Sequence, residues 1–201
     1  MKKQILLLFM LLGIGITAQQ THFGIKAGYS LSNLSVKSTV GKLSYDPKSS
    51  FYIGALAEHT LNDKFSLQAE LLYSTLGGTF KATSTGTSTV EVEDKTTFGT
   101  LQIPLLGKYK LANNFALAAG VNLGAIISAK SNYKDSSGVE KETDFKENVN
   151  TFNIAPLIGL EYNLENKMFV DARYNFGISN ISKIASKETI SFLQVGIGYK
   201  F

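Results

Sequence analysis

The sequence contains no cysteine, no tryptophan and only three prolines among its 201 residues. Without cysteine, an oxidising compartment is allowed but a disulfide framework is excluded. Glycine, serine, threonine, asparagine, tyrosine and phenylalanine are abundant by comparison. This mixture favours strands and turns over helices.

Long apolar runs are also lacking, except near the N-terminus. There, Lys2 and Lys3 precede an apolar stretch at 5–16, and small residues lead to Ala18. This order is that of a secretory signal peptide, and we expect residues 1–18 to be cleaved off. A retained membrane anchor is the alternative, but the run is shorter than the roughly 20 residues that a spanning helix needs.

A strong charge of either sign is missing as well. The formal net charge is +4, and it includes the two N-terminal lysines, so residues 19–201 carry a smaller excess. That excess is too small, and the lysines too scattered, to predict a nucleic-acid partner. The length of residues 19–201 suits one domain.

From Phe23 onward, apolar residues recur at every second position, which is the period of a β-strand. A tilted strand needs roughly 9–11 residues to cross a bilayer. The repeated segments have about this length, so they predict an all-β fold, an eight-stranded antiparallel up-and-down transmembrane β-barrel occupying residues 19–201. The eight segments lie at about 23–32, 51–60, 65–74, 99–111, 115–127, 151–164, 168–179 and 190–201.

Short and long gaps alternate between these segments. The short gaps are 61–64, 112–114 and 165–167, and the long ones are 33–50, about 77–98, 131–150 and 182–189. This order is typical of short periplasmic turns and longer extracellular loops, with both termini in the periplasm. Because the second long gap is rich in Thr and Val, we expect the strands beside it to continue outside the membrane as a hairpin.

Aromatic residues on the apolar face gather near the strand ends. Phe65, Tyr109, Phe115, Tyr162 and Tyr199 lie beside the short gaps or the C-terminus, and Tyr29, Phe51, Tyr73, Phe152 and Phe176 lie towards the long gaps. Two such girdles are typical of a lipid-facing barrel. In a soluble sandwich or a lipocalin-like barrel, which are the alternatives, the apolar face would instead form the core.

The last strand places Val195, Ile197, Tyr199 and Phe201 on one face. A final strand that closes on an aromatic residue resembles the assembly signal of outer-membrane barrels. We therefore expect Tyr199 and Phe201 to be recognised by the barrel assembly machinery of a Gram-negative-type outer membrane, and the protein to be surrounded by outer-membrane lipids.

Four short motifs in order resemble the PorT-like outer-membrane β-barrel family. They are QAELLYS at 68–74, LQIPLLGKY at 101–109, DARYNFG at 171–177 and GIGYKF at 196–201. The likeness covers the chain from about residue 23 to the end, and it implies an outer-membrane location. It also implies a link to secretion for one member of a functionally mixed family. Pro156 departs from the pattern and predicts a bulge or a local break in pairing, since proline has no N–H to donate.

The other face of the strands carries charges, several of them close to the short gaps. An eight-stranded barrel is just wide enough for side chains to fill, so opposite charges should pair inside it. We expect a structural network that fills the periplasmic half, with a wetter vestibule towards the long loops; a selective ion or proton path is the alternative. The predicted network consists of Lys26, Glu58, Glu70, Lys108, Glu161, Asp171 and Arg173, with Gln68, Lys110 and Lys200 also inward.

Catalytic and metal sites are not indicated. His22 and His59 both map to the periplasmic ends of their strands, away from the outer leaflet, so we expect interface residues rather than catalytic ones. Carboxylates such as Glu91, Glu140 and Glu142 lie in loops beside lysines, and their spacing fits no calcium loop. We therefore expect neither enzyme activity, nor a cofactor, nor a bound metal.

The sequence favours a monomeric structural or surface-interaction barrel, because polar loops on a rigid scaffold are where binding usually resides. The expected partners are a surface ligand or an envelope protein that meets the long loops. A small-solute pore and an accessory role in protein secretion are the alternatives.

Overall fold

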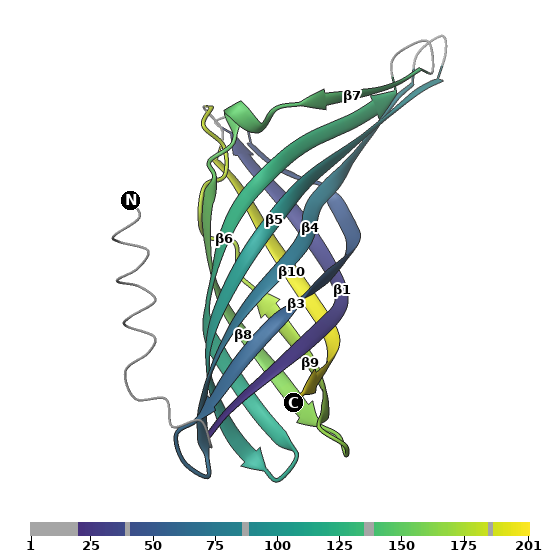
Figure 1. Ribbon diagram of the computed structural model, residues 1–201. Coiled ribbons are helices and arrows are strands. Elements are labelled where there is room, and N and C mark those ends of the chain that lie inside the picture. Colours follow the sequence, from purple (N-terminus) through teal and green to yellow (C-terminus); the bar gives the residue numbers. More distant parts are fainter. Residues whose placement is uncertain (1–19, 39–40, 86–88, 135–138, 185–186) are drawn as a thin grey trace.

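The computed structural model describes residues 20–38, 41–85, 89–134, 139–184 and 187–201. In this part of the chain, eight long strands form a ring, and two short strands extend it at one end (Figure 1). The ring consists of β1 (Thr21–Ser38), β3 (Asp46–Thr60), β4 (Phe65–Thr85), β5 (Thr89–Ala112), β6 (Phe115–Lys134), β8 (Phe152–Asn163), β9 (Met168–Asn175) and β10 (Lys187–Lys200). None of the helices in the described ranges has the length and apolar character needed to span a membrane.

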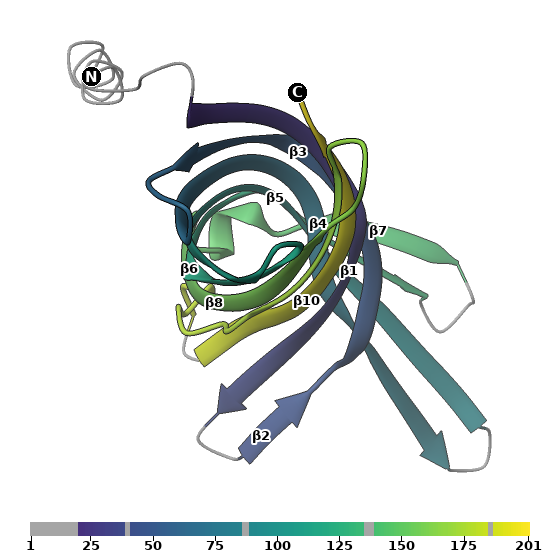
Figure 2. The same ribbon diagram turned by 90° about the horizontal axis from the view of Figure 1, so that it is seen from below.

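The ring is closed by pairing of its first and last strands. Each strand is antiparallel to its neighbour in the ring, and β10 pairs with β1 from Gly24↔Lys200 to Lys37↔Lys187. Closure satisfies the backbone groups that an open sheet would leave at its edges, as a lipid environment requires. Seen along its axis, the barrel is a single ring (Figure 2). The predicted eight-stranded antiparallel barrel is confirmed.

Apolar side chains cover the outside of the ring. Ile53, Leu71, Ile103 and Ile158 are exposed, although each is flanked by inward, buried or half-buried residues. The aromatic residues predicted for the two girdles are exposed or half-buried, and several touch across strands: the Phe65 and Tyr109 ring centroids lie 4.9 Å apart. A soluble sandwich would bury these side chains, so the outward apolar face excludes that alternative.

The connections at the two ends of the barrel differ, as predicted. Short turns join β3 to β4, β5 to β6 and β8 to β9 at the lower end in Figure 1, which we call the short-turn end. At the opposite, long-loop end, β4 and β5 continue pairing up to Thr85↔Thr89, which confirms the predicted hairpin. Two further expected loops are also ordered by pairing, because β2 (Gly41–Ser44) pairs with β1 and β7 (Glu140–Asp144) pairs with β6.

Pro156 interrupts pairing on one side only. The β6–β8 register runs through Val121↔Pro156 without a shift, so no bulge forms on this side. The other predicted outcome, a local break in pairing, is found against β9. On the other side the β8–β9 ladder ends at Leu157↔Asn175, and the Pro156 carbonyl accepts a hydrogen bond from the Phe176 N–H at 2.8 Å. Because proline lacks an N–H, the ladder stops here, and β9 ends before the predicted residue 179.

Candidate functional site

The barrel interior holds a ring of four charges nearest the short-turn end. Lys108 Nζ lies 2.6 Å from Glu161 Oε1 and 3.0 Å from Glu58 Oε2. Lys200 Nζ lies 2.8 Å and 2.6 Å from the same two carboxylates. Two cations and two anions therefore neutralise one another, as buried charges require. We call these four residues the lower charge cluster.

A second group of four charges lies further inside. Lys26 Nζ is 2.6 Å from Asp171 Oδ2 and 3.5 Å from Glu70 Oε1, and Arg173 Nη1 is 2.8 Å from Glu70 Oε2. The Lys26 and Arg173 cations also lie over the ring of Tyr52, at 5.6 Å and 5.8 Å from its centroid. These four ionic residues again sum to zero charge, and we call them the upper charge cluster.

Gln68 joins the two clusters. Its Nε2 donates to Glu70 Oε1 at 2.6 Å, and its Oε1 accepts from Lys108 Nζ at 3.0 Å. The structure thus brings all seven residues of the predicted network into contact, together with Gln68 and Lys200. Lys110 does not join them, because it lies exposed at the mouth of the barrel.

A layer of amides follows above the charges. Gln194 Oε1 accepts from Arg173 Nε at 2.9 Å, and Asn122 Nδ2 donates to Gln102 at 3.2 Å and to Asn175 at 3.1 Å. Gln102 and Gln194 are absent from the predicted set. Their signal is visible all the same, because each is a single amide between two outward apolar residues of an alternating strand.

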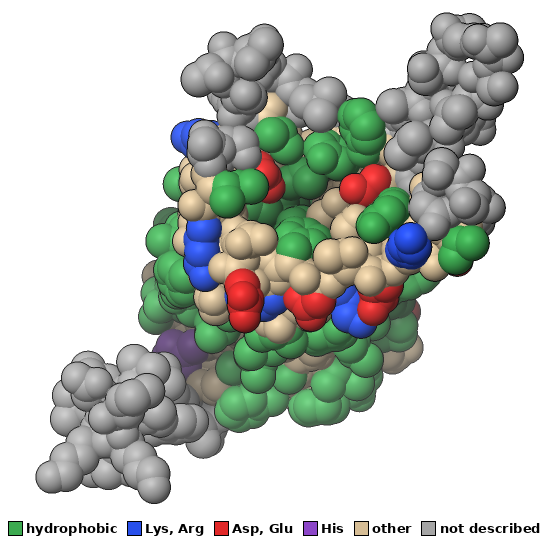
Figure 3. Space-filling view, turned by 90° about the horizontal axis from the view of Figure 1, so that it is seen from above, with side chains coloured by type: hydrophobic (Ala, Val, Ile, Leu, Met, Phe, Trp, Pro, Cys, Tyr) green, Lys and Arg blue, Asp and Glu red, His purple; other side chains and the backbone are tan. Residues whose placement is uncertain are grey.

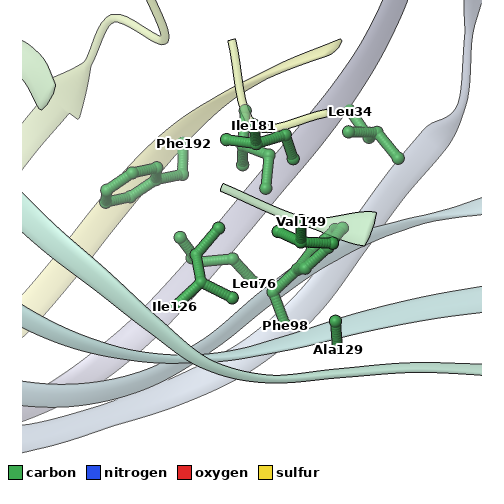
Figure 4. Close-up of a cluster of buried hydrophobic side chains, with 9 residues drawn as sticks. Leu34, Leu76, Phe98, Ile126, Ala129, Val149, Ile181 and Phe192 are labelled. Atoms are coloured by element: carbon green, nitrogen blue, oxygen red, sulfur yellow. The ribbon is translucent and has the colours of Figure 1, made fainter. Parts of the chain in front are cut away.

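Apolar side chains close the long-loop end (Figure 4). We call them the apolar plug: Leu34, Leu76, Phe98, Ile126, Ala129, Val149, Ile181, Ile190 and Phe192. Val149 and Ile181 come from loop segments that are tied together by the Val149↔Ser182 bridge and by a bond of 2.8 Å from Asn150 N–H to the Ile181 carbonyl. The expected wet vestibule is therefore wrong. Burying these side chains removes apolar surface from water, which favours a dry, packed end over an open one.

The outer rim above the plug carries mixed charge. Acidic and basic side chains intersperse around a centre with apolar side chains (Figure 3). Among them, Lys130 pairs with Glu142 at 2.7 Å and Lys134 with Glu140 at 3.8 Å, between β6 and β7. These exposed pairs help to hold β7 beside β6, but each contributes little to stability.

The remaining predicted residues lie apart from the two charge clusters, although His22 lines the same hollow at the short-turn end as Glu58 and Lys200. His22 is exposed, and His59 Nδ1 lies 2.9 Å from Thr21 Oγ1, both at the short-turn end. No group of three His, Cys, Asp or Glu residues in the described ranges is placed to hold a metal ion. The predicted signal peptide and the Glu91 side chain lie outside the part of the chain that is described.

These features define a class: a small outer-membrane β-barrel with an apolar, aromatic-rich exterior and a polar, packed interior. The chain belongs to the outer membrane protein beta-barrel domain family, whose model matches residues 17–183. That membership indicates an outer-membrane location. No curated protein sequence matches the chain significantly.

Solved structures with this fold include two bacterial proteins. Neisserial surface protein A superposes with a TM-score of 0.54 at 16% identity, over 89% of this chain and 97% of that one. Ail, the attachment invasion locus protein of Yersinia pestis, gives a TM-score of 0.51 at 15% identity, over 90% and 99%, in a complex with the heparin analogue sucrose octasulfate. At such identities the similarity establishes the fold alone.

Proposed function

We propose that this protein is a non-conducting barrel that anchors β-hairpin extensions at the cell surface, where they meet a ligand or an envelope protein. The observation that carries the proposal is the filled interior, in which two neutral charge clusters, an amide layer and the apolar plug follow one another along the axis. Short turns face the periplasm in this arrangement, and the extensions face outward.

The packing of the interior argues against the alternative of a small-solute pore. A permeating solute would have to separate Lys108 from Glu161 and Arg173 from Glu70, all of them buried. Separating such pairs leaves uncompensated buried charge, which is costly. The solute would also have to cross the apolar plug, where Phe98 and Ile126 are each 1% exposed.

The surface role follows from the paired extensions. β4 and β5 keep their ladder beyond the barrel, and β7 adds a further strand to β6. In Figure 2 these strands project sideways past the ring. Paired strands hold a binding surface in one shape better than free loops do, because less conformational entropy is lost on binding. The proposal includes no catalytic step.

Planar-bilayer recording of the purified full-length protein tests the closed interior. We expect no stable channel openings above the baseline over a range of voltages, with a general porin as the positive control in the same membrane. Reproducible, long-lived openings that scale with the amount of inserted protein would contradict the proposal and favour the pore.

We also infer that this protein is a member of the PorT-like family of outer-membrane barrels. Three of the motifs behind that resemblance lie in β4, β5 and β9 and supply interior polar residues. They contribute Gln68, Glu70, Gln102, Lys108, Asp171, Arg173 and Asn175. An accessory role in secretion is the functional alternative that this placement brings. The test of that role compares the proteins secreted by the parent strain, a deletion strain and the complemented deletion strain. Unchanged secretion in the deletion strain would rule the role out.

A further inference from the structure

The short-turn end of the barrel is hollowed into a polar cup. The cup has a volume of about 380 Å³ and is lined by residues from every ring strand except β9. This volume lies within the range of small-molecule sites. The walls are the ends of paired strands and two short turns, so the shape is held rigidly by the barrel.

The floor of the cup is the lower charge cluster, which is already balanced. Glu58 and Glu161 each accept from both Lys108 and Lys200 at 2.6–3.0 Å. Ser66 Oγ adds a further bond of 2.7 Å to Glu58 Oε1. Because these carboxylates are engaged from several sides, they offer little to an incoming cation.

The wall of the cup carries a different pair of charges. Lys64 and Lys110 both line it, and the Lys110 N–H donates to the Lys64 carbonyl at 2.8 Å across the β4–β5 junction. Two like charges on directly opposite residues destabilise a sheet. No ion pair joins Lys64 or Lys110 to another residue in the described part of the chain. Of the acidic residues that line the cup there, Glu58 and Glu161 belong to the floor, and Asp63 lies at the rim.

The rest of the wall supplies hydrogen-bonding groups. Asn113, Asn163 and Thr60 line the cup. Asn163 Oδ1 accepts from Lys200 Nζ at 3.3 Å, which orients its amide beside the floor. The excess positive charge sits in a concave site surrounded by the low-dielectric barrel wall and bilayer, and such a site concentrates the field that attracts anions.

We propose that this cup binds a small oxyanion, a carboxylate or a phosphate group, held between Lys64 and Lys110. The anion relieves the repulsion between the two ammonium groups and receives hydrogen bonds from the wall amides. The floor, which is the lower charge cluster, carries no net charge, and it limits how far the anion can enter the barrel. Two sources could supply such a carboxylate or phosphate group. One is a soluble periplasmic metabolite or polymer, and the other is the headgroup of an inner-leaflet phospholipid.

The experiment is an NMR titration of the isotope-labelled full-length protein in micelles of a neutral detergent. Inorganic phosphate and, separately, citrate are added while chloride keeps the ionic strength constant. We expect saturable shifts confined to amides at 62–66, 108–113 and 200, and a dissociation constant raised about fivefold by Lys64→Gln or Lys110→Gln. Both variants remove a repulsion, so they should fold as well as the parent protein.

Lys167→Gln is the matched control, because Lys167 is an exposed lysine in the β8–β9 turn at the same end but outside the cup. Equal weakening by this variant, or shifts that grow linearly without saturation, would overturn the proposal. Repeating the titration in nanodiscs separates the two sources. If an anionic phospholipid alone produces the cup shifts, the headgroup is the occupant, whereas shifts that require added phosphate or citrate identify a soluble ligand.

Discussion

Glu70 shows what holds an ionised side chain inside this barrel. Its carboxylate lies 2.8 Å from Arg173 and 3.5 Å from Lys26, and Gln68 donates to it at 2.6 Å. Each partner was inferred to face inward from the strand period alone. The sequence does not predict all of the contacts between inward residues. Glu70 in β4 and Arg173 in β9 are distant in sequence, and they meet only across the closed ring.

Replacing Glu70 tests the importance of this balance. Glu70→Gln keeps the shape but leaves Lys26 and Arg173 with Asp171 as the remaining anion of the cluster. Breaking a buried pair from one side costs about 3–5 kcal/mol, and we expect this loss in the free energy of unfolding measured by urea titration in lipid vesicles.

A Glu→Gln change in an exposed ion pair is the control for Glu70→Gln. Glu142 pairs with Lys130 at 2.7 Å, but both side chains are about half exposed. Glu142→Gln should therefore leave the free energy of unfolding unchanged, since water solvates both partners after the pair is lost. Equal losses from the two variants would mean that the interior pairs contribute no more than surface ones.

At the scale of the elements, strand period and gap length predicted all eight ring strands and the end at which each connection lies. The lengths of the strands at the long-loop end were less predictable. β1 continues to Ser38 and β6 to Lys134, where the expectation was irregular loop. Beyond the membrane band the outward positions become polar, and inward positions such as Leu34 and Ala129 become apolar and join the plug. The alternation that marks the membrane-spanning part is therefore interrupted while backbone pairing continues.

The β4–β5 extension should be separable from the barrel. Lys81 and Glu93 are opposite one another in the ladder, so replacing residues 82–92 by Asn-Gly gives a two-residue turn at a matching register. We expect the shortened protein to fold, and its unboiled form to migrate faster than the boiled form in detergent gels, like the full-length protein. Loss of the faster band would show instead that the extension is needed to form the barrel.

At the scale of the whole molecule, several layers of side chains fill the interior of the barrel one after another along its axis. The apolar plug lies at the long-loop end, the amides lie below it, and the two charge clusters fill the remainder. Because each layer is packed by a different interaction, loss of one layer leaves the others in place. We therefore expect the barrel to stay closed when a single layer is lost.

Emptying the plug tests this redundancy. Leu76→Ala combined with Phe98→Ala removes two side chains that are at most 2% exposed. We expect at least about 3 kcal/mol of lost unfolding free energy, as in other large-to-small core changes, yet no conductance in planar bilayers. Ile184→Ala, at a side chain that is 63% exposed, is the control and should change neither quantity. Stable channel openings in the double variant would show that the plug alone keeps the barrel closed.

The sequence by itself determined the barrel: the strand number, the outward apolar face, the aromatic girdles and the inward charges all follow from a period of two and from the gap lengths. The tertiary structure alone decided how those inward residues combine. Leu76, Phe98 and Ile126 belong to strands, whereas Val149 and Ile181 belong to loops, and only folding brings them together as a plug. The physical reason is that alternation is local along one strand, while packing, ion pairing and the cup at the short-turn end depend on the register between strands around the ring.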